Sequence, residues 1–201
     1  MNNYLEFILK MQSIAKIGLK FSKDEYAIEN YQEIQDLSKE MLEHYVNDNI
    51  EHDNYYVRDI YPTPNVSVRT IVVNENNEIL FVRERKEKLY SVPGGWCDVF
   101  KDARTNAMAE VKQESGFDVE IDRILAVFDR SKHAFKKSSI AEYCIYFSAH
   151  IIGGKAQVSH ETDDVMFASK SNIPQLSNKN SKDELNIVFD IYYNDKDTYF
   201  D

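Results

Sequence analysis

Apolar residues in the first part of the chain recur at the three- and four-residue spacing of amphipathic helices. The apolar positions of a first predicted helix are Leu5, Ile8, Leu9 and Ala15. Those of a second are Ile28, Tyr31, Ile34, Leu37, Met41, Leu42 and Tyr45. Gly18 is expected to end the first helix, and Ser22 or Asp24 to cap the second. Two helices cannot enclose a core, so residues 1–60 are predicted to form a small all-α domain for docking or dimerisation, the alternative being a substrate-gripping arm.

Pro62 and Pro64 mark a linker, after which β-branched residues dominate the sequence. The predicted strands are 66–72, 79–82, 89–92, 119–121, 124–129 and 142–151. An Asn-rich turn joins the first two, which are expected to form a β-hairpin. Predicted helices cover residues 102–114, with Gly116 as the stop, and the region around 185–192. This order predicts an α+β or α/β fold with a mixed sheet over residues 65–201.

Composition and charge narrow the possible functions. Over 201 residues, 34 acidic side chains against 24 basic ones give a formal net charge of −10. This sign argues against extended binding to nucleic-acid backbones, and any contact with phosphates then requires local bases or bound cations. No apolar run approaches the ~18 residues of a membrane span. The first residues lack the features of a signal peptide, and two cysteines are too few for a disulfide framework, so a cytoplasmic protein is expected.

The segment most suggestive of chemistry is GGWCDVFKDARTNAMAEVKQESGF, residues 94–117. Glu110 and Glu114 lie four positions apart on one face of the predicted helix, with Gln113 beside them. Two like charges at this spacing are offset naturally by a divalent cation with oxygen ligands. Gly94 and Gly95 would let the backbone approach a ligand closely. The alternative is a solvated helix face that carries two glutamates.

This segment resembles the box of the Nudix hydrolase family, which reads G, five residues, E, seven residues, R-E-hydrophobic-x-E-E-x-G-hydrophobic. Gly95 matches the first glycine, Glu110 the glutamate after the arginine, and Glu114 the last glutamate, while Gly116 and Phe117 close the box. The resemblance implies an α/β/α sandwich with a mixed β-sheet and metal-dependent hydrolysis of a pyrophosphate. It also implies Mg²⁺ or Mn²⁺ held by Glu110, Glu114, Gln113 and the Gly94 carbonyl.

Three box positions depart from the family pattern. Lys101 stands at the early glutamate, Ala109 at the arginine and Gln113 at the middle glutamate. An amide oxygen can bind Mg²⁺ but brings no charge, so the affinity for a second or third metal ion is expected to fall. Either the enzyme works with fewer bound ions, or the domain is a catalytically weakened nucleotide-binding sensor or interaction module.

Further site residues follow from the resemblance. Family members recruit another acid outside the box, and Glu161 is the candidate for an additional metal ligand or for the general base. The candidate substrate-binding side chains are Arg83, Arg85, Arg130, Lys132, His133 and Trp96. For the cations the alternative is a solvated charged surface, and for Trp96 it is core packing.

A narrower resemblance covers almost the whole chain. The segments 14–19, 93–99, 128–133 and 174–177 are similar to a bacterial Nudix subgroup that has an N-terminal helical region. That subgroup includes ADP-ribose pyrophosphatases and a dimeric CDP-choline pyrophosphatase. The resemblance implies a nucleoside diphosphate joined to a further group as the substrate, and a homodimer. Action on RNA ends is a third possibility, which the acidic net charge disfavours.

Overall fold

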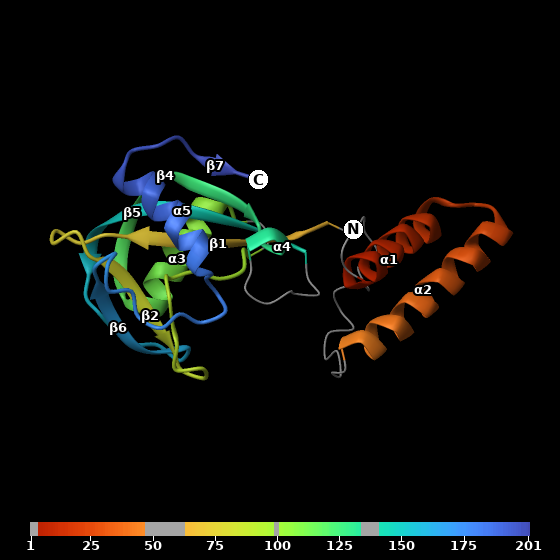
Figure 1. Ribbon diagram of the computed structural model, residues 1–201, viewed down its shortest axis with the longest axis horizontal. Helices are drawn as coiled ribbons and strands as arrows, with labels where there is room; N and C mark the ends of the chain where they lie inside the picture. Colours follow the sequence, from red (N-terminus) through yellow and green to blue (C-terminus); the bar gives the residue numbers. More distant parts are fainter. Residues whose placement is uncertain (1–3, 47–62, 99–100, 134–140) are drawn as a thin grey trace. The chain divides into compact units, whose positions relative to one another are not determined.

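A computed structural model describes residues 4–46, 63–98, 101–133 and 141–201. The chain divides into two compact units, Met1–Pro64 and Asn65–Asp201 (Figure 1). Much of the segment between Tyr55 and Pro64, where the sequence predicts a linker, lies outside the described residues. No helix within the described ranges has the length and apolar character needed to cross a membrane.

Within residues 4–46, the first unit is a pair of helices, α1 (Tyr4–Phe21) and α2 (Glu25–Val46). Asp24 caps α2, since its Oδ1 atom accepts a hydrogen bond from the Ala27 amide at 2.8 Å. The expectation that Gly18 ends α1 is wrong, because the helix continues to Phe21. A β-carbon at position 18 would clash with the ring of Tyr31, so the glycine serves close helix packing instead of a helix stop.

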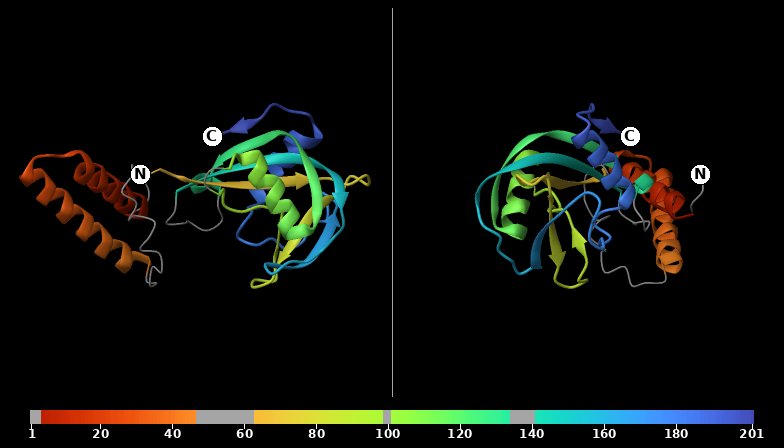
Figure 2. Two further views of the ribbon diagram at one scale, coloured as in Figure 1. Left: turned by 180° about the vertical axis from the view of Figure 1, so that it is seen from behind. Right: turned by 60° about the vertical axis from the view of Figure 1, so that its left-hand side comes forward.

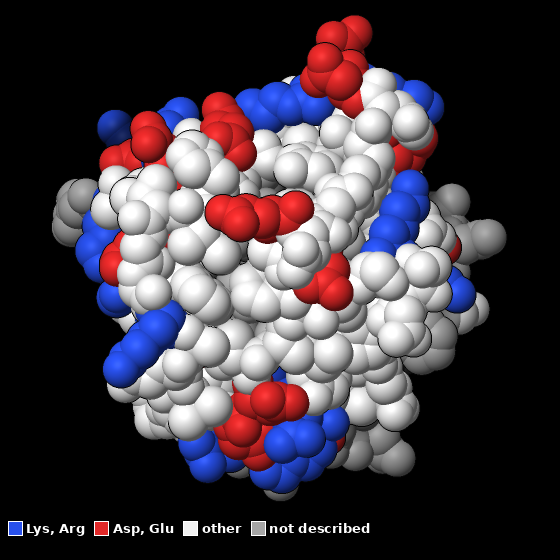
Figure 3. All heavy atoms as spheres, turned by 90° about the vertical axis from the view of Figure 1, so that its left-hand side faces the viewer, with Lys and Arg blue, Asp and Glu red and all other residues white. Residues whose placement is uncertain are grey.

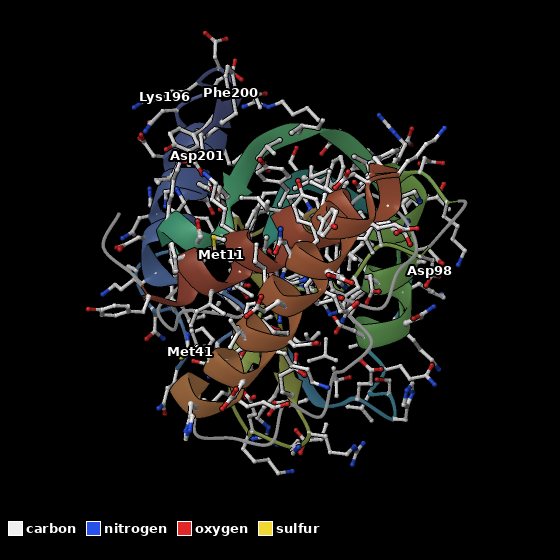
Figure 4. All side chains as sticks on the ribbon, turned by 90° about the vertical axis from the view of Figure 1, so that its right-hand side faces the viewer. Met11, Met41, Asp98, Lys196, Phe200 and Asp201 are labelled. Atoms are coloured by element: carbon white, nitrogen blue, oxygen red, sulfur yellow. The ribbon has the colours of Figure 1, made fainter. Side chains whose placement is uncertain are left out.

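Several large apolar side chains of this first unit are exposed. They are Tyr4, Phe7, Ile14, Phe21, Tyr26, Ile28, Leu37 and Met41. On α2, the spacing places Tyr26, Leu37 and Met41 on one side of the helix, which also carries the exposed Asn30 and Glu33 and is separate from the face that buries Ser38 and Leu42. Figure 4 labels Met41 on α2. We call Tyr26, Leu37 and Met41 the α2 stripe.

The second unit contains two sheets. Its strands are β1 (Asn65–Val72), β2 (Ile79–Glu84), β3 (Tyr90–Ser91), β4 (Phe117–Asp129), β5 (Glu142–Gly154), β6 (Thr162–Ala168) and β7 (Tyr199–Phe200). One sheet has the order β1-β5-β4-β7, with β1/β5 and β4/β7 parallel and β4/β5 antiparallel. The other has the order β3-β2-β6 and is antiparallel. The predicted mixed α+β architecture is therefore confirmed.

Three helices complete the unit: α3 (Ala103–Ser115), α4 (Arg130–His133) and α5 (Lys182–Tyr193). Alternating strand residues face two separate cores. Phe81 belongs to the core that includes Leu185 and Phe189 of α5, while Leu80 belongs to the core that includes Val111 of α3. α3 and α5 thus lie on opposite sides of the strands, as in an α/β/α sandwich (Figure 2).

The predicted hairpin of residues 66–72 and 79–82 is wrong. Asn74 forms the expected turn, because its side-chain oxygen accepts from the amides of Asn76 and Glu78. The flanking strands nevertheless enter different sheets and share only the isolated bridge Val73–Ile79. Residues 79–82 are fully buried, so β2 needs apolar neighbours on both faces, and it finds its strand partners in β3 and β6.

The two strands predicted at residues 119–121 and 124–129 are one continuous strand, β4. Asp122 and Arg123, which interrupt the apolar pattern, fall at an irregularity in the pairing of β4 with β5. Such a bulge lets a strand continue past residues that break its alternation.

Candidate active site

The helix that carries the candidate carboxylates begins and ends where the sequence predicts. Asp102 caps α3, since its Oδ1 atom accepts from the Thr105 amide at 2.8 Å. Gly116 ends the helix in the left-handed conformation, with φ 81°, and its amide donates to the Lys112 carbonyl. Local residues at both ends therefore define the segment that presents Glu110 and Glu114.

The glycine loop after β3 closes directly on this helix. The Gly94 amide donates to Oε2 of Glu114 at 2.8 Å, and its backbone has a φ of 150° with no space for a β-carbon beside the Val68 carbonyl. A β-carbon at Gly95 would lie 2.6 Å from Oε1 of Glu110. Both glycines are therefore needed for the two carboxylates to reach the loop backbone.

Burial dominates the electrostatics of the carboxylates. The Glu114 side chain is almost completely buried, and this burial raises its pKa to about 7, although the charge of Lys179 and the Gly94 hydrogen bond oppose the rise. Burial also raises the pKa of Glu110, against the lowering effect of Arg69 and Lys179. Glu161 and Asp98 add to the rise at Glu110, so their charges reach it. A buried carboxylate is costly in its charged form unless a cation lies beside it, so this pair of acids favours a cation as a partner.

Lys179 and Glu84 belong to this site and were missed in the sequence. Nζ of Lys179 lies 2.7 Å from Oε1 of Glu84 and 3.4 Å from Oε1 of Glu114. Burial lowers the pKa of Lys179, but Glu114 and Glu84 outweigh it and raise the value, so the amine carries a charge at neutral pH. Lys179 is 65 positions from Glu114 and lies in an irregular segment, so no sequence spacing points to it.

Glu161 lies on a loop whose path is fixed by Arg85. The Arg85 guanidinium donates to the carbonyls of Ser159, His160 and Thr162, and its amide donates to the Glu161 carbonyl at 2.8 Å. The hydroxyl of Thr162 donates to the Glu114 carbonyl at 2.7 Å, which joins this loop to the end of α3. The Glu161 side chain is 54% exposed, with its carboxylate 3.3 Å from His160.

The predicted substrate-binding cations do not come together in one cluster. Arg83 pairs with Asp163 at 2.7 Å, and Arg85 holds the loop described above. Arg130 is buried and lies 3.2 Å from the fully buried Glu184, while His133 contacts Asp201 at 2.9 Å. Arg130 and His133 are thus occupied by partners within the protein, whereas Arg83 is 34% exposed and Arg85 is exposed at the surface. Lys132 is exposed, and Trp96 is 47% exposed beside the glycine loop.

Two of the residues that depart from the box pattern, Lys101 and Gln113, have exposed side chains. Lys101 forms an exposed ion pair with Asp98 at 2.7 Å, and Gln113 is exposed on α3 (Figure 4 labels Asp98). Within the described ranges, no group of three or more His, Cys, Asp or Glu side chains is arranged to hold a metal ion. Glu110 and Glu114 against a glycine loop nevertheless provide the oxygen donors that Mg²⁺ or Mn²⁺ prefers, and the lack of a side chain at Gly95 leaves room for the Glu110 carboxylate against the loop. The residues present therefore fit such an ion.

Known proteins resemble this chain over both units. Residues 2–52 match the family Nudix_N, described as a UDP-X-like, N-terminal oligomerisation domain. A Bacillus subtilis protein, provisionally named an ADP-ribose pyrophosphatase, is 38% identical over 98% of this chain and 97% of its own length.

Solved structures agree with this match. A crystal structure of a UDP-X diphosphatase covers 98% of both chains with a TM-score of 0.66 and 27% identity. An ADP-ribose pyrophosphatase from Streptococcus suis covers 69% of this chain and 100% of its own, with a TM-score of 0.62 and 32% identity. The chain thus belongs to the Nudix hydrolase family and combines the domain that carries the box with an N-terminal helical domain of the UDP-X-like kind.

Proposed function

We propose that the protein hydrolyses the pyrophosphate linkage of a nucleoside diphosphate joined to a further group, of the CDP-choline or ADP-ribose type, and releases a nucleoside monophosphate. The observation that carries this proposal is the convergence of Glu110 and Glu114 on the Gly94–Gly95 loop. Family membership indicates hydrolysis as the reaction class. The two carboxylates beside the glycine loop are the groups that we propose to support it.

Glu110, Glu114 and the Gly94 carbonyl would hold a divalent cation, Mg²⁺ or Mn²⁺, with Gln113 as a neutral ligand and Glu161 as a further acid. Such an ion neutralises the charge of the pyrophosphate and polarises its phosphorus when it is bound. The exposed Glu161 carboxylate, whose charge reaches Glu110, is suited to accept a proton from the attacking water. The loop that Arg85 holds keeps Glu161 near the helix.

The substrate class is supported by two lines of argument. The names of the relatives, ADP-ribose pyrophosphatase and UDP-X diphosphatase, both describe nucleoside diphosphates that carry another group. Charge also favours a small anionic ligand over a long one, because the formal net charge of −10 opposes extended contact with a nucleic-acid backbone. On the face in Figure 3, acidic groups lie near the middle and the basic groups lie mainly towards the margin. Trp96, exposed beside the glycine loop, is available to stack on a base.

A second candidate function is a nucleotide-binding sensor without turnover. Gln113 removes one box charge, and Lys179 contacts the carboxylate that would hold the ion. To separate the two, the protein is incubated with CDP-choline, ADP-ribose and nucleotide sugars, each with Mg²⁺ or Mn²⁺, and release of monophosphate is measured. We expect turnover of at least one compound. Binding of nucleotides without any release would support the sensor and refute the enzyme.

Restoring the missing box charge should strengthen the site. Gln113→Glu is expected to raise the affinity for Mg²⁺, or kcat/KM, by about tenfold, because an additional carboxylate joins the exposed side of the carboxylate pair. Steady-state kinetics over a Mg²⁺ titration would measure this. Gln175→Glu, the same change at an exposed position outside α3, is the control. An unchanged or lower rate for Gln113→Glu would mean that the site functions with glutamine as it stands.

We also propose that residues 1–60 make the protein a homodimer through the α2 stripe of Tyr26, Leu37 and Met41. Leu37 and Met41 are exposed one helical turn apart, and the match of residues 2–52 to an N-terminal oligomerisation domain supports a second copy of the chain as the partner that covers them. Leu37→Lys should convert the dimer to a monomer in sedimentation-velocity experiments, because it places a charge in an apolar interface. Glu43→Lys, exposed on another face of α2, should leave the dimer intact. A wild-type protein that sediments as a monomer would exclude this assignment.

A further inference from the structure

Lys179 places a charged amine inside the carboxylate site. Its side chain is 33% exposed, and its ammonium group bridges Glu84 of β2 and Glu114 of α3. Glu84 has a second partner, since the Ser91 hydroxyl donates to the same Oε1 atom at 3.1 Å. The amine therefore contacts the side chain that, in the proposed function, also binds the divalent cation.

Two buried arginines hold the main chain of the loop that carries Lys179 through hydrogen bonds. The Lys179 carbonyl accepts from Nη1 of Arg130 at 2.7 Å and from Nε of Arg69 at 3.5 Å. Arg130 also donates to the Asn178 carbonyl at 3.1 Å. Both arginines are less than 9% exposed, so they bind the main chain in an environment where such hydrogen bonds are strong.

The next residue anchors the same loop a second time. Asn180 is buried, its side-chain oxygen accepts from the Val92 amide at 3.0 Å, and its amide group donates to the Tyr146 hydroxyl at 2.7 Å. Val92 lies just before the glycine loop, so one anchor joins the Lys179 segment to the backbone that closes on Glu114. A loop held at three consecutive residues presents its exposed side chain from a fixed point.

An ammonium group and a divalent cation that both contact Glu114 repel each other, and the single carboxylate charge does not neutralise both, so a further anion beside them is favoured. The anion that the proposed function brings to this place is the pyrophosphate of the substrate. We propose that Lys179 is a substrate-binding residue: its ammonium group rests on Glu84 and Glu114 in the free protein and holds an anionic oxygen of the pyrophosphate when a cation occupies the carboxylates. This inference rests on the proposed function and adds to it a specific residue for the phosphate charge.

The test is Lys179→Met, which keeps the length of the side chain and removes its charge. Two measurements follow: binding of Mn²⁺ alone by titration calorimetry, and KM and kcat for the substrate found in the panel. We expect Mn²⁺ to bind about tenfold more tightly, because the competing cation is gone. We expect KM to rise about 10- to 100-fold, as for the loss of a charged hydrogen bond. Lys182→Met, an exposed lysine three residues further on, is the matched control and should change neither value.

Lys179→Arg keeps the charge and should recover most of the loss in KM, whereas a merely structural role would lower the unfolding midpoint of Lys179→Met along with its activity. Thermal unfolding of each variant separates loss of binding from loss of fold. A KM unchanged from that of Lys182→Met would overturn the proposal, whatever the Mn²⁺ titration gives. If the wild type hydrolyses no compound, the proposed function fails, but binding of ADP, CDP and UDP still decides the role of Lys179. Equal binding by the wild type and Lys179→Met would then refute it.

Discussion

Glu114→Gln is expected to lower kcat/KM by on the order of 10²–10³ while leaving the fold intact. Glutamine keeps the shape of the side chain and an oxygen that can accept the Gly94 amide hydrogen bond. It removes the buried negative charge that, with Glu110, would attract a divalent cation and through it the pyrophosphate. Steady-state kinetics with the substrate identified in the panel measure the loss, and calorimetry with Mn²⁺ should show weaker binding in parallel.

The matched control for this variant is Glu120→Gln, the same substitution at an exposed glutamate of β4. It should retain wild-type kinetics and Mn²⁺ binding. Circular dichroism should show the same helix content and a similar thermal midpoint for both variants, since neither removes buried volume. Full activity in Glu114→Gln would show that the charge of this carboxylate takes no part in hydrolysis and would make Glu114 a structural residue.

Arg130→Met is expected to destabilise the protein by about 3–5 kcal/mol, because it leaves an uncompensated buried carboxylate. Glu184 is fully buried and lies 3.2 Å from Arg130. Its other contacts, the Ser181 amide at 2.9 Å and the Tyr146 hydroxyl at 3.3 Å, are neutral donors and do not replace the guanidinium charge. Urea or thermal unfolding followed by circular dichroism would measure the change.

A second substitution identifies the cause of that loss. Adding Glu184→Gln to Arg130→Met removes the unpaired charge but keeps an acceptor for Ser181, so it should recover more than half of the lost stability. Lys196→Met, which breaks the exposed pair with Asp190, should leave the unfolding midpoint nearly unchanged (Figure 4 labels Lys196). No recovery in the double variant would assign the loss to the carbonyls of Asn178 and Lys179 that Arg130 also binds.

The sequence predicted those parts of the site that depend on neighbouring residues. The bounds of α3 follow from Asp102 and Gly116, and the common face of Glu110 and Glu114 follows from their spacing within one helix. The contact of this helix with the glycine loop could be anticipated only through the family resemblance. Local signals thus predicted that the two carboxylates share one helix face, and the resemblance to the Nudix box predicted that they bind a metal ion.

Features that depend on contacts distant in sequence were not predicted. The turn at Asn74 was correct, but the partner of β1 is β5, and no local signal shows which strand a β-strand will pair with. Lys179 lies beside Glu114 on a loop that Arg69 and Arg130, from two other elements, and the buried Asn180 hold in place. The sequence predicts a helix stop at Gly18. In the structure this glycine instead allows close contact with Tyr31 of the neighbouring helix, a role that no local signal shows.

The way Arg85 holds the loop at residues 159–162 leaves part of that loop free to change. Arg85 binds main-chain carbonyls, and the side chains that shape the loop are the hydroxyls of Ser159 and Thr162. The exposed side chains of His160 and Glu161 contact each other at 3.3 Å, while the hydrogen bonds described above as setting the path of the loop come from Arg85, Ser159 and Thr162. Position 160 can therefore be varied in a library with the loop backbone retained, and such a library would test whether the side chain beside the proposed acid Glu161 affects substrate preference.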